Sequence, residues 1–257
     1  MAAVPVGVIG NPASHGNRAW RSEALRAVAD RHESVMLAEP RTRKALADAL
    51  RGFREAGVAL VAVSGGDGTL REVLTALPRA WPGPHPELAL LPAGKTDVAA
   101  GDVGGAGYGA LGLARLLSAI ERGAPLRREE RPVLEVHWPG TANPPLRGFL
   151  FGAAAFSEGH RLANARLHSG GVFGKVAVGL TVAAMLARAA AGGRGKLANG
   201  QRMALTADGA PLPLGRRFLV LATTLERLTL GLWPVRDAGA GPLHWLDMDA
   251  PPRRLAR

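Results

Sequence analysis

The sequence ALVAVSGGDGTLREVLTAL, residues 59–77, runs from an unbroken apolar segment through a glycine-rich turn into a second, periodic segment. Residues 59–63 are all apolar, which is typical of a strand that is buried on both faces of a parallel sheet. After the turn, apolar residues recur at i, i+3, i+4 and i+7, namely Leu70, Val73, Leu74 and Leu77. This spacing predicts a helix packed on the sheet, so the turn is expected at the carboxyl edge of the strand.

The same alternation of short apolar runs and helical stripes continues on both sides of this segment. Strands are expected at 6–9, 35–37 and 88–91, and helices at 20–28, 46–53 and 111–120. The last helix is indicated by the apolar residues Leu111, Leu116, Leu117 and Ile120. Because alternating strands and helices favour a parallel sheet, we predict an α/β domain over residues 1–124.

The pattern changes beyond residues 124–132, which have the composition of a polar linker. Residues 133–138 and 218–221 have the pattern of strands, and the turns between such segments are rich in glycine, proline and asparagine. We therefore predict a second, mainly antiparallel β-sandwich domain over residues 133–257. One apolar helix is expected within it at 176–191, and its weakly charged part is shorter than the roughly 20 residues that span a bilayer.

The composition limits the classes of function. The chain has 257 residues, no cysteine and a formal net charge of +11. The lack of cysteine excludes disulfides, thiolate zinc sites and cysteine nucleophiles, and it fits a reducing compartment. Residues 1–5 have no signal-peptide pattern, so a cytoplasmic location is expected. The positive charge attracts polyanions, but dispersed basic residues without interleaved aromatic residues argue against nucleic acid as the partner.

The turn Gly65-Gly66-Asp67-Gly68-Thr69 has the chemistry of a phosphate site. Glycines permit positive φ and let a phosphate approach the backbone, and the start of the following helix favours negative charge. The Asp67 carboxylate suits Mg²⁺, so a nucleoside triphosphate with Mg²⁺ is the expected ligand. The alternative is a tight turn in which Thr69 and Glu72 form a capping box without any ligand. We favour the ligand because three glycines around one aspartate exceed what such a turn needs.

These residues resemble the diacylglycerol kinase catalytic family of lipid kinases, in which the same pentapeptide precedes a helix like that of residues 70–74. Three other segments strengthen the resemblance. Residues 11–16, Asn-Pro-Ala-Ser-His-Gly, look like the family's Asn-Pro loop, and Thr42 matches a threonine that the family places near the nucleotide. Residues 91–97, Leu-Pro-Ala-Gly-Lys-Thr-Asp, are similar to the family's Pro-x-Gly-Thr-Gly-Asn-Asp loop.

The resemblance implies particular site residues. Those expected to contact the nucleotide are Asn11, Thr42, Gly65, Gly66, Asp67, Gly68, Thr69, Gly94, Lys95 and Thr96. It also implies that Asp67 is a catalytic residue, and that Asp67 and Asp237 are ligands of Mg²⁺. The first domain would thus be a nucleotide-binding domain, and the second would bind the lipid substrate.

The chain departs from the family pattern at two places. Aligned without gaps, Lys95, Thr96, Asp97 and Val98 replace the family's Thr, Gly, Asn and Asp. A cation at Lys95 is expected to contact a phosphate as a point charge. The family's Asp-Gly-Glu segment has no counterpart, and residues 208–210 fit an ordinary hairpin turn. The general base is therefore unassigned.

The function implied by the resemblance is transfer of the γ-phosphate of ATP to the hydroxyl of diacylglycerol or a related lipid. Such an enzyme would be cytoplasmic, would use ATP and Mg²⁺, and would contact the anionic inner face of the membrane peripherally. Two alternatives stay open at this point. One is an enzyme like NAD kinase with the same glycine turn, and the other is a non-catalytic relative that binds a nucleotide or a lipid.

Overall fold

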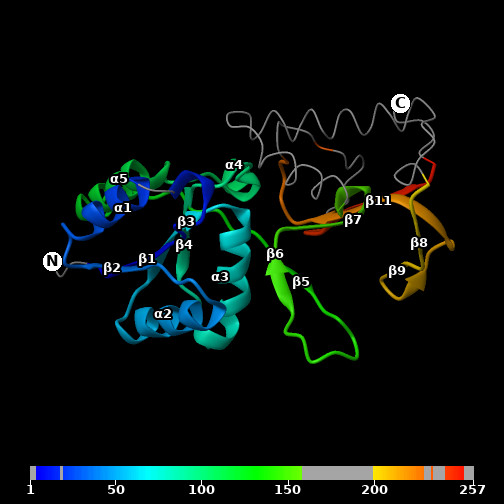
Figure 1. The fold of residues 1–257 in the computed structure, drawn as a ribbon, viewed down its shortest axis with the longest axis horizontal. Helices are drawn as coiled ribbons and strands as arrows, with labels where there is room; N and C mark the ends of the chain where they lie inside the picture. The colour runs from blue at the N-terminus through cyan, green and yellow to red at the C-terminus, as the bar shows by residue number, and fades with distance from the viewer. Residues whose placement is uncertain (1–3, 18–19, 158–198, 229–232, 234–240, 252–257) are drawn as a thin grey trace. The chain divides into compact units, whose positions relative to one another are not determined.

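The computed structural model describes residues 4–17, 20–157, 199–228, 233 and 241–251. The chain divides into two compact units, Met1–Gly148 and Phe149–Arg257 (Figure 1). The predicted domain bounds, 1–124 and 133–257, stay a prediction.

The first unit is built on a parallel sheet of four strands in the order β2-β1-β3-β4. The strands are β1 (Val6–Gly10), β2 (Val35–Ala38), β3 (Leu60–Gly65) and β4 (Glu87–Pro92). Each agrees with an apolar run in the sequence, and together they confirm the predicted α/β fold. Because all four strands run parallel, the loops that follow them lie at the same edge of the sheet, its carboxyl edge.

Helices cover both faces of this sheet. They are α1 (Trp20–Ala29), α2 (Arg43–Glu55), α3 (Asp67–Ala80), α4 (Val98–Val103) and α5 (Gly109–Glu121), with a short 3-10 helix, η1 (His15–Asn17). Figure 1 shows α1 and α5 on one face, and α2 and α3 on the other. The helix α4 was not predicted, because a single turn-rich hexamer carries no helical apolar stripe.

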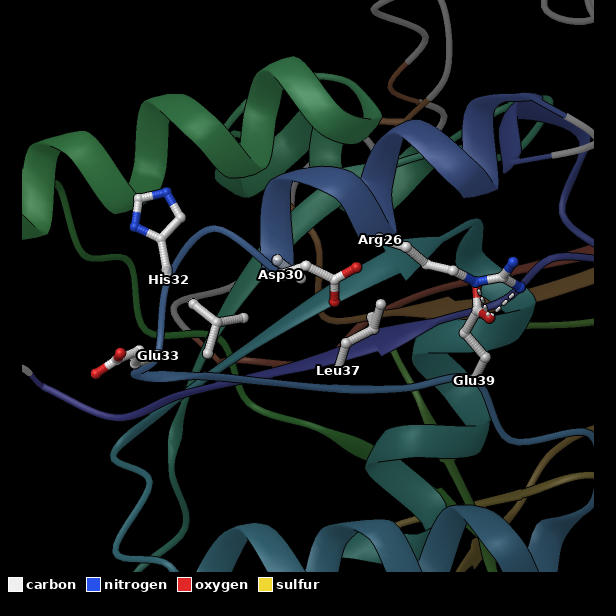
Figure 2. Close-up of a pocket in the computed structure, with 8 residues that line it drawn as sticks. Arg26, Asp30, His32, Glu33, Leu37 and Glu39 are labelled. Carbon is white, nitrogen blue, oxygen red and sulfur yellow. Dashed lines mark hydrogen bonds and ion pairs between the residues drawn. The ribbon is translucent and has the colours of Figure 1, made fainter.

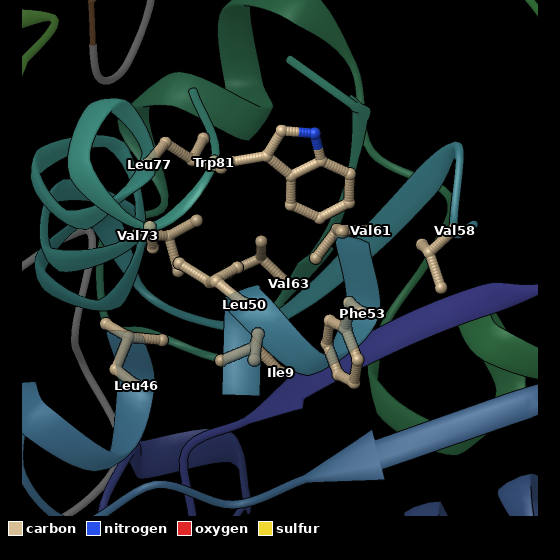
Figure 3. Close-up of a cluster of buried hydrophobic side chains, with 11 residues drawn as sticks. Ile9, Leu46, Leu50, Phe53, Val58, Val61, Val63, Val73, Leu77 and Trp81 are labelled. Carbon is tan, nitrogen blue, oxygen red and sulfur yellow. The ribbon is translucent and has the colours of Figure 1, made fainter. Parts of the chain in front are cut away.

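Strand β3 shows why its sequence is apolar without alternation. Val61 and Val63 point into a core shared with α2 and α3, which also contains Leu50, Phe53 and Trp81 (Figure 3). Alternate residues of the same strand point to the opposite face, where Leu60 and Ala62 pack in a core with Leu25, Leu113, Leu116 and Leu117. Since both faces are covered, every position of the strand is buried.

The predicted closing helix is present as α5, but Leu111, one of the residues that indicated it, is 72% exposed, while Leu113 is fully buried. The helix α5 starts at Gly109, and its buried stripe continues through Leu116 and Leu117, which places Leu111 outside the stripe. The predicted linker contains no helix or strand, but Arg131 anchors it through an ion pair of 2.9 Å with Asp102.

A hairpin of β5 (Leu134–Val136) and β6 (Leu146–Gly148) completes the described part of the first unit. It packs on α3, where the backbone N–H of Arg147 donates to the Thr75 hydroxyl at 3.0 Å. This contact explains why the hairpin groups with the parallel sheet.

The second unit contains antiparallel strands, as the sequence predicts. Strand β11 (Gly215–Thr223) pairs with β12 (His244–Asp249), β7 (Leu150–Ala154) and β8 (Gln201–Met203). A separate ribbon joins β9 (Thr206–Ala207) to β10 (Ala210–Pro211). Its turn residues, Asp208 and Gly209, both have positive φ, at 49° and 81°, which confirms the predicted hairpin turn.

Some predictions fall on residues that the structure does not describe. The helix expected at 176–191 and the proposed magnesium ligand Asp237 lie outside the described residues. Within the described part of the chain, no helix has both the length and the apolar character required to cross a bilayer.

Candidate functional site

Three loops meet at the carboxyl edge of the parallel sheet. They follow β1, β3 and β4, and direct backbone hydrogen bonds join them. Gly16 N donates to Ala93 O at 2.7 Å, and Ala93 N donates to Gly65 O at 3.0 Å. Asn11 N donates to Ser64 O, also at 3.0 Å. The predicted residues of the Asn-Pro loop, the glycine turn and the Gly94 loop are therefore neighbours in space.

Asn17 fixes the first loop, although the sequence analysis did not select it. Its side chain is 2% exposed, and its amide nitrogen donates to the backbone and hydroxyl oxygens of Ser64 at 2.9 and 3.0 Å. The same nitrogen donates to Asn11 O at 3.1 Å. The signal available in the sequence was Ser64 itself, a polar residue that ends an otherwise apolar strand. A buried hydroxyl needs a partner, and Asn17 supplies it.

Asn11 reaches directly into the glycine turn. Its side-chain nitrogen donates to the Thr69 hydroxyl at 2.8 Å, and the Ser14 hydroxyl lies 3.4 Å from the same oxygen. The Thr69 hydroxyl therefore binds the first loop instead of capping a helix. The N-cap of α3 is Gly66, which makes no side-chain capping bond, so the alternative of a Thr69–Glu72 capping box is wrong.

Glu72 pairs with arginines on two helices. Arg43 Nε, at the start of α2, lies 2.7 Å from one carboxylate oxygen, and an Arg71 nitrogen lies 2.7 Å from the other. The hydrogen bond from Arg43 lowers the pKa of Glu72, partial burial opposes this effect, and the bond from Arg71 adds to it. The Arg43–Glu72 pair links α2 to α3 beside the glycine turn, and the lowered pKa keeps Glu72 ionised at neutral pH.

The glycines of the site have different structural reasons. None of Gly65, Gly66 and Gly68 has a positive φ, so the expected left-handed conformation is absent from the turn. At Gly65, an added Cβ would lie 2.4 Å from the Thr69 side chain, and at Gly66 it would lie 2.8 Å from Gly94 Cα. Close packing therefore requires these two glycines. Gly68 is different, because no described atom apart from its chain neighbours and the backbone of its own helix lies within 4 Å of the position of its Cβ.

The Asp67 carboxylate caps the helix α4. One oxygen accepts from Ala99 N at 3.0 Å, and the other accepts from Val98 N at 3.0 Å and from the Thr96 hydroxyl at 3.1 Å. Asp97 stands at the N-cap position of α4 but makes no capping bond with it. Its Oδ1 instead accepts from Gly94 N at 2.8 Å, within its own loop.

Lys95 lies between these anchored residues and is half-buried. No residue in the described ranges forms a hydrogen bond or an ion pair with its ammonium group. Thr42 is less closely connected, since its hydroxyl accepts from Ala45 N at 3.1 Å and thereby caps α2. The structure thus brings together the predicted residues of three loops, and it gives Thr42 a local capping role.

Among the described residues, no three or more His, Cys, Asp or Glu side chains lie together so that they could hold a metal ion. A cavity of about 480 Å³ lies elsewhere in the first unit, between α1, the following loop and β2 (Figure 2). An ion pair of Arg26 with Glu39 forms part of its wall. None of the predicted site residues lines this cavity, so the candidate site is the loop cluster at the sheet edge.

The part of the chain that contains these loops is similar to a known protein family. Residues 5–124 match the family model described as the diacylglycerol kinase catalytic domain. That range contains the whole parallel sheet and all three loops. A comparison with curated protein sequences gives no match.

Two solved structures, both of proteins from Bacillus anthracis strain Sterne, share the fold. One is the crystal structure of a diacylglycerol kinase, with a TM-score of 0.57 and 16% identity over 97% of this chain and 75% of that chain. The other is assigned as a diacylglycerol kinase, with a TM-score of 0.59 and 16% identity over 96% of this chain and 76% of that chain. At this identity the likeness concerns the fold alone. Residues 5–124, just under half of the chain, are thus similar to the diacylglycerol kinase catalytic domain.

Proposed function

We propose that the protein is an ATP-dependent lipid kinase, which transfers the γ-phosphate of ATP to the hydroxyl of diacylglycerol or a related lipid. One observation carries the proposal. The domain that matches a kinase family has its glycine turn at the start of α3, with Gly68 open on its Cβ side and the half-buried Lys95 on the adjoining loop. This arrangement suits an anionic ligand.

The physical support is electrostatic. The first turn of a helix leaves backbone N–H groups without intrahelical acceptors, and its dipole favours an anion by about 0.3–1 kcal/mol. The long helix α3 presents such a turn at Asp67 and Gly68. Phosphoryl transfer depends mainly on positioning and on charge neutralisation, and a lysine beside the turn would add both. We propose that Lys95 contacts a phosphate of the bound nucleotide.

Magnesium would enter with the nucleotide. Mg²⁺ usually keeps several waters and binds one or two carboxylates together with phosphate oxygens. The described residues fit this mode better than a cage made of protein ligands alone, because they contain no cluster of acidic side chains. The carboxylates predicted for the metal are Asp67 and Asp237, of which only Asp67 is described.

We also propose that the first unit contacts an anionic membrane surface from the cytoplasm. Leu111 and Tyr108, at the start of α5, are 72% and 66% exposed, the highest values among the large apolar side chains of the described residues. Arg115 is exposed one turn farther along the same face. Near an anionic surface each arginine contributes about 1 kcal/mol, and salt screens this attraction. The fraction of protein that sediments with phosphatidylglycerol vesicles should therefore fall as salt increases, and Leu111→Asp should lower this fraction further.

The deciding experiment is a phosphorylation assay with labelled ATP. Mixed vesicles would present diacylglycerol and related lipids that carry a free hydroxyl, and a parallel reaction would contain NAD. Phosphorylation of a lipid alone supports the proposal, whereas phosphorylation of NAD alone identifies an NAD kinase. ATP binding without turnover on any substrate would identify a non-catalytic relative. One observation favours this last candidate, namely that the Asp67 carboxylate is already engaged by three donors.

A further inference from the structure

The geometry points to Asp67 as a positioning residue, which holds the loop that carries Lys95 in place for the nucleotide. This inference rests on the proposed function and deepens it, because it assigns Asp67 a role other than binding metal. The helix α4 is capped by Asp67 and not by the residue at its own N-cap position. The residue at the N-cap, Asp97, bonds within its own loop, while Asp67 caps the helix from 30 or so positions earlier in the chain.

The cap provided by Asp67 is important because α4 is short. It contains six residues, Val98–Val103, and isolated helices of that length are unstable in water. Its first backbone N–H groups, those of Val98 and Ala99, each donate to the Asp67 carboxylate at 3.0 Å. A negative charge at this end also interacts favourably with the helix dipole. Loss of the carboxylate would leave both N–H groups and the Thr96 hydroxyl without this acceptor.

The Lys95 loop is fixed to the glycine turn on both sides of the lysine. Before Lys95, Gly94 packs against Gly66 so closely that a Cβ on Gly94 would lie 2.7 Å from Gly66 Cα. After Lys95, Thr96 donates to Asp67 at 3.1 Å. The backbone of Lys95 thus spans two anchors that both belong to the glycine turn. A change at Asp67 is expected to act on the nucleotide through the position of Lys95.

The alternative role, direct coordination of Mg²⁺, competes for the same lone pairs. An ionised carboxylate has about four acceptor sites, and hydrogen bonds already use three of those of Asp67, which leaves about one for a metal ion. The two roles predict different results. A positioning residue should affect the nucleotide with or without Mg²⁺, whereas a metal ligand should affect it only when Mg²⁺ is present.

The first test needs no ligand. Amide hydrogen exchange of residues 94–103 would be compared between the unmodified protein and the isosteric variant Asp67→Asn, with Thr96→Val as a milder second variant. In Asp67→Asn one of the two acceptor oxygens becomes an amide NH2, so either Val98 N–H or Ala99 N–H loses its acceptor, and exchange at that amide should become roughly 5-fold faster. The control is Asp48→Asn, which removes a surface carboxylate of α2 that pairs with Lys44. Unchanged exchange at both amides in Asp67→Asn would overturn the inference.

The second test is a double-mutant cycle on ATP affinity, measured by calorimetry with Mg²⁺ and with EDTA. Lys95→Ala should weaken binding roughly 10-fold, as expected for a charged hydrogen bond. Asp67→Asn should weaken it in both conditions, and in the Lys95→Ala background it should add less than about 2-fold. Additive effects that appear only with Mg²⁺ would instead make Asp67 a metal ligand. If the unmodified protein binds no ATP, the proposed function fails, and the exchange experiment still decides the role of Asp67 in the loop.

Discussion

The substitution Gly68→Ala separates the stability of the turn from its proposed use. Apart from chain neighbours and the backbone of α3 itself, no described atom lies within 4 Å of the Cβ position, and the φ of Gly68 is not positive. Alanine therefore fits without strain, and in a helix it is more favourable than glycine by about 0.5–1 kcal/mol. For a domain of this size, such a gain raises the Tm by roughly 1–4 °C. If no ligand binds at this turn, Gly68→Ala should raise the stability of the protein and have no other effect.

The proposed ligand reverses that expectation for binding. A methyl group on the open side of the first turn of α3 occupies the space through which a phosphate would approach the backbone. We expect calorimetry to show a loss of ATP affinity of roughly 10-fold or more, the size of a lost charge-assisted hydrogen bond. The matched control is Gly52→Ala in α2, where a Cβ also meets no described atom within 4 Å, and which should gain stability without losing affinity. Equal ATP affinity in Gly68→Ala and Gly52→Ala would refute the reasoning.

Three other changes test the packing of the site. Gly66→Ala should destabilise the protein by about 1–3 kcal/mol in urea titrations, because its Cβ would lie 2.8 Å from Gly94 Cα. Asn17→Ala should cost a similar amount, about 1–3 kcal/mol, since it leaves the buried Ser64 hydroxyl without its partner and Ser64 O with one donor fewer; an unchanged urea midpoint would contradict this. The lowered pKa of Glu72 implies stability that is present above the usual value of 4.5 and is lost as the pH falls through the lowered pKa. The urea midpoint of the unmodified protein should therefore fall as the pH is lowered from 6 to about 3, and in Arg43→Ala this fall should be smaller.

Much of the fold could be predicted because its signals are local. Apolar runs locate β1 and β3, and the stripe from Leu70 to Leu77 locates α3, since both patterns repeat within a few residues. The hairpin turn at Asp208 and Gly209 is local as well. The position of the glycine turn at the carboxyl edge then follows because the turn comes directly after β3, a strand of a parallel sheet.

The contacts that organise the site could not be predicted in the same way. Asp67 caps a helix 31 residues away in sequence, and Asn11 binds Thr69 across 58 residues. Local patterns compare residues three or four positions apart, so they suggested a capping box between Thr69 and Glu72. In the structure, Thr69 and Glu72 instead have distant partners: Asn11 binds Thr69, and Arg43 binds Glu72. The sequence could identify which residues have suitable chemistry, but the fold decides which of them meet.

The replacements at residues 95–98 leave the hydrogen bonds that fix this loop in place. Two of its anchors are backbone groups, Gly94 N and Val98 N, which persist whatever side chain stands at position 98. Asp97 has φ 48° and ψ 52°, a left-handed conformation that asparagine and aspartate tolerate better than most residues, so aspartate in place of the family's asparagine keeps the turn. The loop geometry therefore survives these replacements. What changes is the chemistry presented at two positions, a cation at Lys95 and an apolar side chain at Val98, and the Lys95→Ala titration measures the first of them directly.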